Sequence, residues 1–256
     1  MKKILGLLLV LFIFAGCQSI KGGDLNDIKK RQKIVIGTEE TWAPWTYTDE
    51  KDNVVGYDIE VGKYIADYIG VEAEFVKTEW DNILSGVKAG RFDLMINGCD
   101  VTDDRKQVYD FSDPYAFDKT VVIVRGDDDR IKTLEDLDGK DTANTPSSIY
   151  AEIAESYGAK NTPVDDLAET FELLKNKKID ATLNSEATFN YLMSVNPDYN
   201  FKVVSAYGDA ADIAIPMKKG SSDLLAKVNE AIAAARADGT LLKLSMKYFG
   251  TDMTTK

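Results

Sequence analysis

Lys33-Ile34-Val35-Ile36-Gly37-Thr38 is a short apolar run of the type that forms a buried strand. Gly70 closes the helical pattern that follows, in which apolar residues are spaced by three and four, namely Val61, Tyr64, Ile65, Tyr68 and Ile69. The alternation then repeats, with strands expected at residues 72–76 and 92–96 and a helix at 80–89. Strands that alternate with helices in this way predict an α/β fold with a parallel sheet.

A second α/β unit begins near Lys119. The remaining segments predict strands at residues 121–124, 179–183, 201–205 and 213–216, and helices at 148–157, 167–174, 186–195, 224–237 and 241–249. Neither an internal repeat nor a low-complexity tract is visible in this part of the sequence. The pattern as a whole predicts two α/β lobes.

Composition excludes several classes of function. The 256 residues carry 31 Lys plus Arg against 43 Asp plus Glu, a formal net charge of −12, and 44% of them are apolar. The apolar content supports a real core, and the acidic balance argues against nucleic acid or an anionic membrane surface as the main partner. The chain has no His and only two cysteines, Cys17 and Cys99, so we expect neither a metal site nor a cofactor.

The N-terminus has the features of an export signal. Met1-Lys2-Lys3 is basic and Ile4–Ala15 is almost wholly apolar, but a run of about a dozen residues is shorter than the roughly 20 that span a bilayer. We therefore predict a signal peptide at residues 1–16. Two alternatives for this segment are an ordinary signal peptide cut near a Cys that carries no lipid, and a short membrane anchor.

Phe14-Ala15-Gly16-Cys17 resembles the lipobox of bacterial lipoproteins. The resemblance implies that Cys17 becomes the first residue of the mature chain and carries a lipid. Residues 17–32 are polar and contain Gly22-Gly23 and Lys29-Lys30-Arg31, so we expect them to form a flexible tether.

Several segments, in this order and spacing, resemble one protein family. They are Gly37–Trp45, Gly56–Val61, Trp80–Gly86, Ala89–Asp93, Asn97–Arg105, Tyr109–Tyr115, Asp238–Thr240 and Lys247–Gly250. Over residues 33–252 the chain resembles the extracytoplasmic solute-binding proteins of ABC transporters, polar amino-acid type. The resemblance implies a type II periplasmic-binding-protein-like fold with a ligand cleft. Lobe 1 would comprise residues 33–117 and 214–256, lobe 2 would comprise 118–213, and two hinge strands would cross near 116–119 and 208–213.

An amino-acid zwitterion needs a cation for its carboxylate, an anion for its ammonium and a shaped wall for its side chain. Arg105 offers a planar fork that can hold a carboxylate through two parallel bonds. Ser147 or Ser148 is a candidate N-cap of the next helix, whose free N–H groups attract an anion. The resemblance implies that Arg105 and this turn meet the same carboxylate.

The resemblance also implies the walls of the cleft. Trp42 lies where the family places an aromatic ring on the ligand, and Trp80 matches the apolar residue on the opposite wall. Glu39 matches a position that often contacts a polar end of the ligand. Core packing is the alternative role for both Trp residues.

Two positions depart from the family pattern around the ligand ammonium. Asp100 stands where the family carries Ser, Thr or Gly, close to the backbone carbonyl of Gly98, and Ser185 stands where the family carries an Asp that holds the ammonium. We expect the ammonium anchor to have moved from Ser185 to Asp100. Alternatively, Asp100 neutralises Arg105 and weakens carboxylate binding.

Residues 139–148 and 180–184 look most like the cystine-binding branch of the family. Cys99 lies in the expected binding loop, where a thiol could exchange with a cystine ligand. A small buried apolar residue is the favoured interpretation of Cys99.

The expected protein is therefore a monomeric, lipid-anchored receptor outside the cytoplasm. It would capture a small polar solute by hinge closure and deliver it to an ABC permease. The expected solute is an amino acid, and cystine is the favoured one. The protein would be no enzyme, would contact no nucleic acid and would touch the membrane only through the lipid on Cys17. The alternatives are a dehydratase-like enzyme on the same fold, with Asp100 or Glu186 as acid or base, and a sensory or adhesion lipoprotein.

Overall fold

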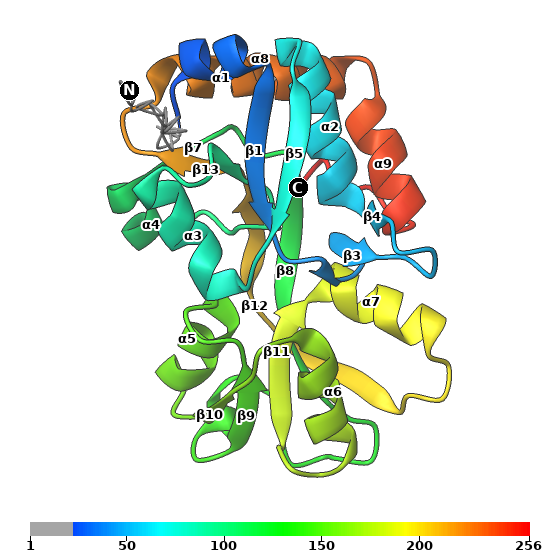
Figure 1. Cartoon of the computed structure of the whole chain (residues 1–256). Helices are drawn as coiled ribbons and strands as arrows, with labels where there is room; N and C mark the ends of the chain where they lie inside the picture. The colour runs from blue at the N-terminus through cyan, green and yellow to red at the C-terminus, as the bar shows by residue number, and fades with distance from the viewer. Residues whose placement is uncertain (1–22) are drawn as a thin grey trace, which may run out of the picture.

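The computed structural model describes residues 23–256. The predicted signal peptide, Cys17 and the first part of the expected tether lie outside the described residues. The chain folds into two lobes, one above the other in Figure 1, which two long strands join. Within the described part of the chain, every helix is too short or too polar to cross a bilayer.

Lobe 1 is built on a mixed five-stranded sheet in the order β5-β1-β6-β13-β7. Its strands are β1 (Lys33–Thr38), β5 (Glu72–Lys77), β6 (Leu94–Met95), β7 (Tyr109–Phe111) and β13 (Pro216–Lys218). β1 pairs in parallel with β5 and β6, which confirms the parallel sheet predicted for this unit, whereas β13 runs antiparallel to β6 and β7. A small antiparallel sheet of β2 (Thr41–Trp42), β3 (Thr46–Thr48) and β4 (Val54–Val55) adjoins it.

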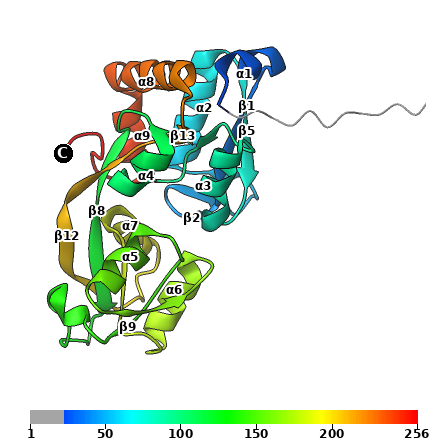
Figure 2. The same ribbon diagram turned by 90° about the vertical axis from the view of Figure 1, so that its left-hand side faces the viewer.

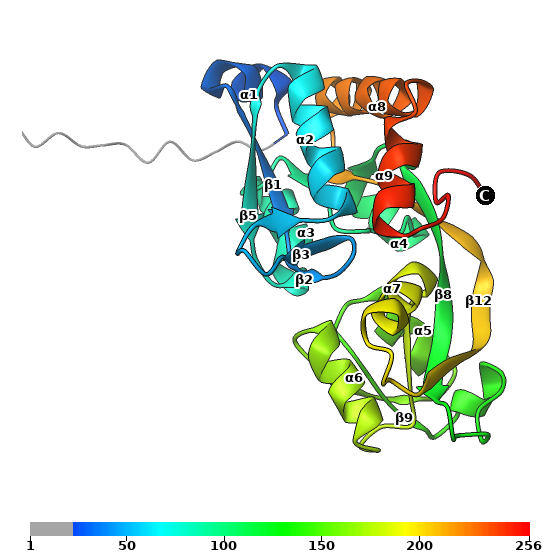
Figure 3. The ribbon, with the colours of Figure 1, turned by 90° about the vertical axis from the view of Figure 1, so that its right-hand side faces the viewer.

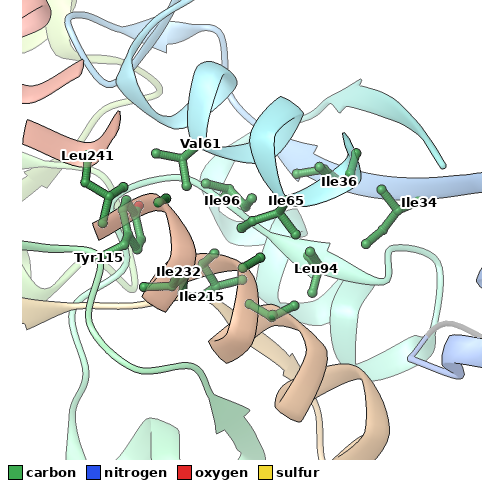
Figure 4. Packing of buried hydrophobic residues seen from close by; sticks show 14 of the residues in the cluster. Ile34, Ile36, Val61, Ile65, Leu94, Ile96, Tyr115, Ile215, Ile232 and Leu241 are labelled. Atoms are coloured by element: carbon green, nitrogen blue, oxygen red, sulfur yellow. The ribbon is translucent and has the colours of Figure 1, made fainter. Parts of the chain in front are cut away.

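Helices cover both faces of the lobe 1 sheet. They are α1 (Leu25–Arg31), α2 (Tyr57–Ile69), α3 (Trp80–Ala89), α4 (Asp103–Val108), α8 (Ser222–Ala237) and α9 (Thr240–Tyr248). Alternate residues of β1 enter different cores: Ile34 and Ile36 pack with α2 and α8, whereas Val35 packs with α3. Figure 4 shows the first of these cores, where Val61 and Ile65 of α2 meet Ile232 of α8 and Leu241 of α9.

Lobe 2 carries a second five-stranded sheet in the order β10-β9-β11-β8-β12. Its strands are β8 (Ala116–Arg125), β9 (Asp141–Asn144), β10 (Lys160–Pro163), β11 (Ala181–Ser185) and β12 (Phe201–Ile213). Its helices are the short 3₁₀ helix η1 (Glu135–Leu137) with α5 (Ile149–Ser156), α6 (Leu167–Lys175) and α7 (Glu186–Val195). The predicted α/β organisation with two lobes is thereby confirmed.

The long antiparallel pair β8–β12 connects the lobes. Figures 2 and 3 show the two strands side by side along one edge of the molecule, with their lobe 1 ends at Ala116 and Ile213, which pair with each other. Asp100 of lobe 1 forms an isolated bridge to Ile213, and the amide of Val101 donates to the carbonyl of Asp212 at 3.0 Å. The loop that carries Asp100 is therefore fixed directly to the hinge.

The prediction of a flexible tether is wrong for its last part, because the helix α1 occupies residues 25–31. The Asp24 side chain caps this helix, accepting from the amides of Asn26 and Asp27. Ile28 is fully buried and packs into the lobe 1 core, and the Arg31 guanidinium pairs with the buried carboxylate of Asp93. One apolar residue per turn and one ion pair are enough to hold a short helix against a preformed core.

Candidate functional site

A cleft of about 580 Å³, counting its open mouth, lies between the lobes. Residues of both lobes line it: Glu39, Thr41, Trp42, Trp80, Gly98, Asp100, Asn144, Thr145, Ser148, Ile149, Tyr150, Asp166, Leu167, Thr170 and Asn184. Of the residues proposed from the sequence, the structure brings Glu39, Trp42, Trp80, Gly98, Asp100 and Ser148 together in this lining. Arg105, Ser147 and Ser185 lie outside the lining.

Two tryptophans form apolar walls of the cleft. Trp42 lies on β2 and stacks on Trp45, with 5.5 Å between ring centroids. Its indole Nε1 reaches across the cleft and donates to Oδ1 of Asn184 in lobe 2 at 3.4 Å. Trp80 begins α3, and the Arg105 guanidinium lies 5.5 Å from the centroid of its ring. The walls are aromatic surfaces against which an aliphatic or planar side chain can pack.

Arg105 lies directly behind this lining. It sits on α4, whose N-cap Thr102 accepts the Arg105 amide, and it is nine-tenths buried. Its Nη1 donates to the backbone oxygen of Asp100 at 3.1 Å and its Nη2 to the backbone oxygen of Ser147 at 3.3 Å. Among the described residues no ion pair joins its guanidinium to the carboxylate of Asp100. The alternative in which Asp100 neutralises Arg105 through direct contact is therefore absent from this structure.

The start of α5 forms the lobe 2 side of the cleft beside Arg105. Ser148 caps the helix, because its Oγ accepts the amide of Ala151 at 3.2 Å. Ser147 adopts a left-handed backbone at φ 56°, and its hydroxyl donates to Oδ1 of Asp81 in lobe 1. Within residues 23–256 the amides of Ile149 and Tyr150 in this first turn have no intrachain acceptor, so they are available to an anion.

The close packing of the Trp42 ring requires a glycine at position 98, beside the buried acid Asp58. Gly98 has φ 52°, and a Cβ there would lie 2.4 Å from the Trp42 ring. Its amide donates at 2.7 Å to Asp58, which is fully buried and also accepts the Tyr115 hydroxyl at 2.7 Å. Burial raises the pKa of Asp58 to about 7, against the lowering effect of these bonds. Asp58 thus holds the Gly98 loop and the wall formed by Trp42 in place.

Glu39 places a carboxylate in the cleft. It accepts Nδ2 of Asn97 at 2.7 Å, while the Glu39 amide donates to Oδ1 of the same side chain at 2.8 Å. Burial raises the pKa of Glu39 to about 7, and the hydrogen bond from Asn97 opposes this rise. A positive ligand group at this position would replace the lost hydration of Glu39 and favour its ionised form.

Asp100 is nine-tenths buried in the lining. Burial raises its pKa to about 6, and the charge of Arg105 opposes that rise. The site therefore contains a carboxylate at the position where the sequence predicted an ammonium anchor.

Ser185 has a different position from the one predicted. It is 1% exposed and caps α7, accepting the amide of Thr188, and its hydroxyl donates to Oδ2 of Asp118. This bond turns the Ser185 hydroxyl toward the hinge strand β8, which accounts for its absence from the lining. Its neighbour Asn184 lines the cleft instead.

Sequence reasoning missed several polar residues of the site. Asn144 ends β9, Asn184 is the last residue but one of β11, Asp166 caps α6, and Asp118 lies on the hinge strand beside Ser185. Asp118 is followed by the polar Lys119 and Thr120, ahead of the apolar part of β8, so its surroundings in the sequence carried no strong signal. The other three lie in polar segments whose approach to the cleft depends on the tertiary fold.

Cys99 is fully buried, with Sγ 3.7 Å from Nη1 of Arg105. Burial raises the pKa of its thiol to about 12, against the lowering effect of the Arg105 charge. The thiol is therefore protonated at neutral pH and a poor nucleophile for disulfide exchange, which supports the interpretation as a small buried residue. No group of three metal-ligating side chains occurs in the described part of the chain.

Comparison with known proteins supplies a family. The model of the bacterial extracellular solute-binding proteins, family 3, matches residues 34–251. The chain is 33% identical to the "Probable amino-acid ABC transporter-binding protein" of Haemophilus influenzae, over 91% of each chain. It is 35% identical to the L-cystine-binding protein TcyA of Bacillus subtilis, over 91% of this chain and 88% of the relative.

A solved structure of an ancestral arginine-binding protein bound to arginine superposes with a TM-score of 0.81 at 34% identity, covering 86% of this chain and 99% of the other. The names of these relatives describe binding proteins, which supports the prediction of a binding protein over that of an enzyme. The match over nearly the whole described chain shows that the protein belongs to the bacterial extracellular solute-binding proteins, family 3.

Proposed function

We propose that this protein is the amino-acid receptor of an ABC transporter, anchored outside the cell membrane by a lipid on Cys17. The single observation that carries the amino-acid assignment is the cleft between the lobes, which is walled by Trp42 and Trp80, contains carboxylates and the start of α5, and has Arg105 against Trp80 and the Ser147 backbone. The cystine- and arginine-binding relatives support the same ligand class. The lipid can be tested through incorporation of labelled palmitate, which Cys17→Ala should abolish.

In this proposal the ligand carboxylate lies between Arg105 and the free amides at the start of α5. It would take over the guanidinium N–H groups that now bond the backbone oxygens of Asp100 and Ser147. Because Arg105 belongs to lobe 1 and Ser147 to lobe 2, a carboxylate held by both stabilises the closed arrangement of the lobes. The ligand thereby favours the closed state by its differential contacts.

The lining favours a ligand with a cationic side chain. It contains Glu39, Asp100 and Asp166, and no Lys or Arg among the described residues. The far end of cystine carries an ammonium, which could pair with Glu39, and also a carboxylate, for which the lining offers no cation, whereas the guanidinium or ammonium of a cationic side chain brings no such extra anion. We therefore place arginine-like amino acids first and cystine, which the sequence favours, second.

Closure would pivot on the hinge strands near residues 116–119 and 208–213. The lobes touch in the present structure through the Trp42–Asn184 hydrogen bond and the two bonds of Ser147 to Asp81 and Arg105. We propose that a membrane permease recognises this closed form and receives the ligand when the lobes part.

The test is thermal unfolding of the chain from residue 20 onward against a panel of amino acids that includes L-arginine, L-lysine and L-cystine. A ligand at a hundred times its Kd should stabilise the protein by about 2.7 kcal/mol. Arg105→Ala should abolish the shift, whereas Arg91→Ala, an exposed arginine stacked on Phe92, should leave it unchanged. A panel without any shift in the wild type would contradict the proposed ligand class.

A further inference from the structure

A second cavity lies behind the main cleft, at the hinge, and in this structure it is too narrow to hold a water molecule. It shares Trp42, Gly98, Asp100 and Tyr150 with the lining of the cleft, and extends to Asp118 on β8. We call this cavity the hinge chamber. Its position next to the Asp100–Ile213 bridge makes it the point where lobe 1, lobe 2 and the hinge meet.

The surroundings of the Asp100 carboxylate indicate that a ligand group binds at the mouth of the hinge chamber. The residue is 9% exposed and lines both cavities. Among the described residues no side chain and no amide of another residue donates to its carboxylate oxygens; the Arg105 guanidinium bonds its backbone oxygen instead. A buried carboxylate without a donor costs free energy in the empty protein. An incoming positive group would remove that cost.

Asp118 faces the same chamber from the opposite side and is fixed in place. It is also 9% exposed. Its Oδ2 accepts the Ser185 hydroxyl, and its Oδ1 accepts the amides of Lys119 at 2.8 Å and Ala187 at 3.4 Å. These three donors hold the carboxylate at a defined position and leave about one of its four lone-pair sites, on Oδ2, free for a ligand.

We propose that Asp118 is a further ligand-binding residue, which together with Asp100 holds the ammonium group of the ligand at the mouth of the hinge chamber, which widens to admit it. This inference rests on the proposed amino-acid receptor and extends it to a residue from the hinge strand. Ser185 then acts as a positioning residue, because its hydroxyl orients Asp118 and does not touch the ligand. The anchor has therefore moved to the hinge and is divided between Asp100 and Asp118.

The charges around the chamber favour a cation. The pKa of Asp118 is raised to about 7, because burial and, to a smaller extent, the nearby charge of Asp100 outweigh the lowering by the bonds from Ser185 and Lys119. The other titratable groups that face the pair are Arg105 of α4 and Tyr150 of α5. Lys119 lines the chamber, but its side chain is exposed to solvent.

A pH dependence follows from these pKa directions. In the empty protein both carboxylates gain protons as the pH falls through about 7 and about 6. An ammonium group binds the ionised pair, so binding releases protons near neutral pH and weakens as the pH falls.

The experiment is isothermal titration of the full chain, in mild detergent, with paired probes that differ only in the α-amino group. L-arginine is compared with guanidinovaleric acid, and L-cystine with dithiodipropionic acid. The wild type should prefer each amino acid, and Asp118→Asn should weaken amino-acid binding by about ten- to a hundredfold with little effect on the desamino acids. Binding measured in buffers of different ionisation enthalpy should show proton release that Asp118→Asn reduces.

Glu186→Gln is the matched control, because Glu186 follows Ser185 but does not line the chamber; it should keep the preference for the amino group. If Asp118→Asn does not fold, Asp100→Asn serves as the second variant, since the Asp100 side chain has no donor from another residue to lose.

The role of Asp118 would be overturned if Asp118→Asn weakened the binding of the amino acid and of its desamino partner equally. It would also be overturned if the variants kept the wild-type preference for the amino acid. In both cases the receptor assignment stands. Binding of neither probe by the wild type would instead overturn the proposed function, and the role of the chamber with it.

Discussion

Asp100 combines a cost in stability with a role in binding. Its pKa is about 6 in the folded protein against the ordinary value of 3.8, because burial penalises its charged form. A group with a raised folded pKa stabilises the protein below its unfolded pKa and loses that contribution as the pH rises through the folded value. The ligand-free protein should therefore lose stability between about pH 4 and pH 7 on account of this residue.

Asp100→Asn should raise the free energy of unfolding of the ligand-free protein at pH 8, by about 1 to 3 kcal/mol, because it removes a buried charge without a donor from another residue. The difference from the wild type should vanish near pH 4, where Asp100 is protonated in both states. Urea unfolding at the two pH values measures it.

Asp209→Asn, at an exposed acid on β12, should change neither value. Lower stability of Asp100→Asn at pH 8 would show that the carboxylate has a donor that the structure does not contain.

At the same scale, the sequence identified part of the cleft lining but not the hinge acid Asp118 behind it. Trp42, Trp80 and Glu39 could be proposed because they lie in segments with a family resemblance. Asp118 could not, since its partner Ser185 is 67 residues away in the chain and only the pairing of β8 with β11 brings the two together. Such a pair is visible only after the sheet register is known.

Among the elements, α3 and the turn before α5 make one of the contacts between the lobes. The Ser147 hydroxyl of lobe 2 bonds the carboxylate of Asp81 on α3, beside the bond from Arg105 to the Ser147 carbonyl. Asp81 does not line the cleft. It should therefore act on closure and not on direct ligand contact.

Asp81→Ala should speed ligand release by about ten- to a hundredfold, in line with the loss of one hydrogen bond to a charged group, with little change in the association rate. Stopped-flow tryptophan fluorescence can measure the rate of ligand release, because Trp42 and Trp80 line the cleft.

Ser147→Ala should have the same effect, and the double variant should add little, because both changes remove the same bond. Additive effects of the two variants would mean that this bond does not contribute to closure.

Strong periodic patterns allowed the prediction of most elements, and polar segments prevented it elsewhere. α7 has the predicted bounds and β1, β5 and β6 form the predicted parallel set. β9 and β10 were missed, because the sequences Asp-Thr-Ala-Asn and Lys-Asn-Thr-Pro lack an apolar alternation. β12 was predicted only at its start, with a separate strand at 213–216, because two register shifts interrupt its pattern.

On the scale of the whole molecule, the C-terminal segment braces the hinge. The amide of Phe117 on β8 donates to the carbonyl of Met253 at 2.7 Å, and Lys256 pairs with Asp212 of β12 at 2.6 Å. Both hinge strands are thus tied to the same end of the chain in lobe 1. Rotation of lobe 2 is left as the main freedom of the molecule, which fits a receptor that opens and closes about one axis.

The central claim is that the cleft closes on an amino acid whose carboxylate is held by Arg105 and α5. Its most direct test is isothermal titration with L-arginine and with agmatine, which lacks only the carboxylate, together with the pair of L-cystine and cystamine. We predict that one of the amino acids binds at least about a hundredfold more tightly than its decarboxylated partner, because a bidentate, charge-assisted contact is lost in the partner. Equal affinity within both pairs, or binding of the decarboxylated compounds alone, would contradict the account.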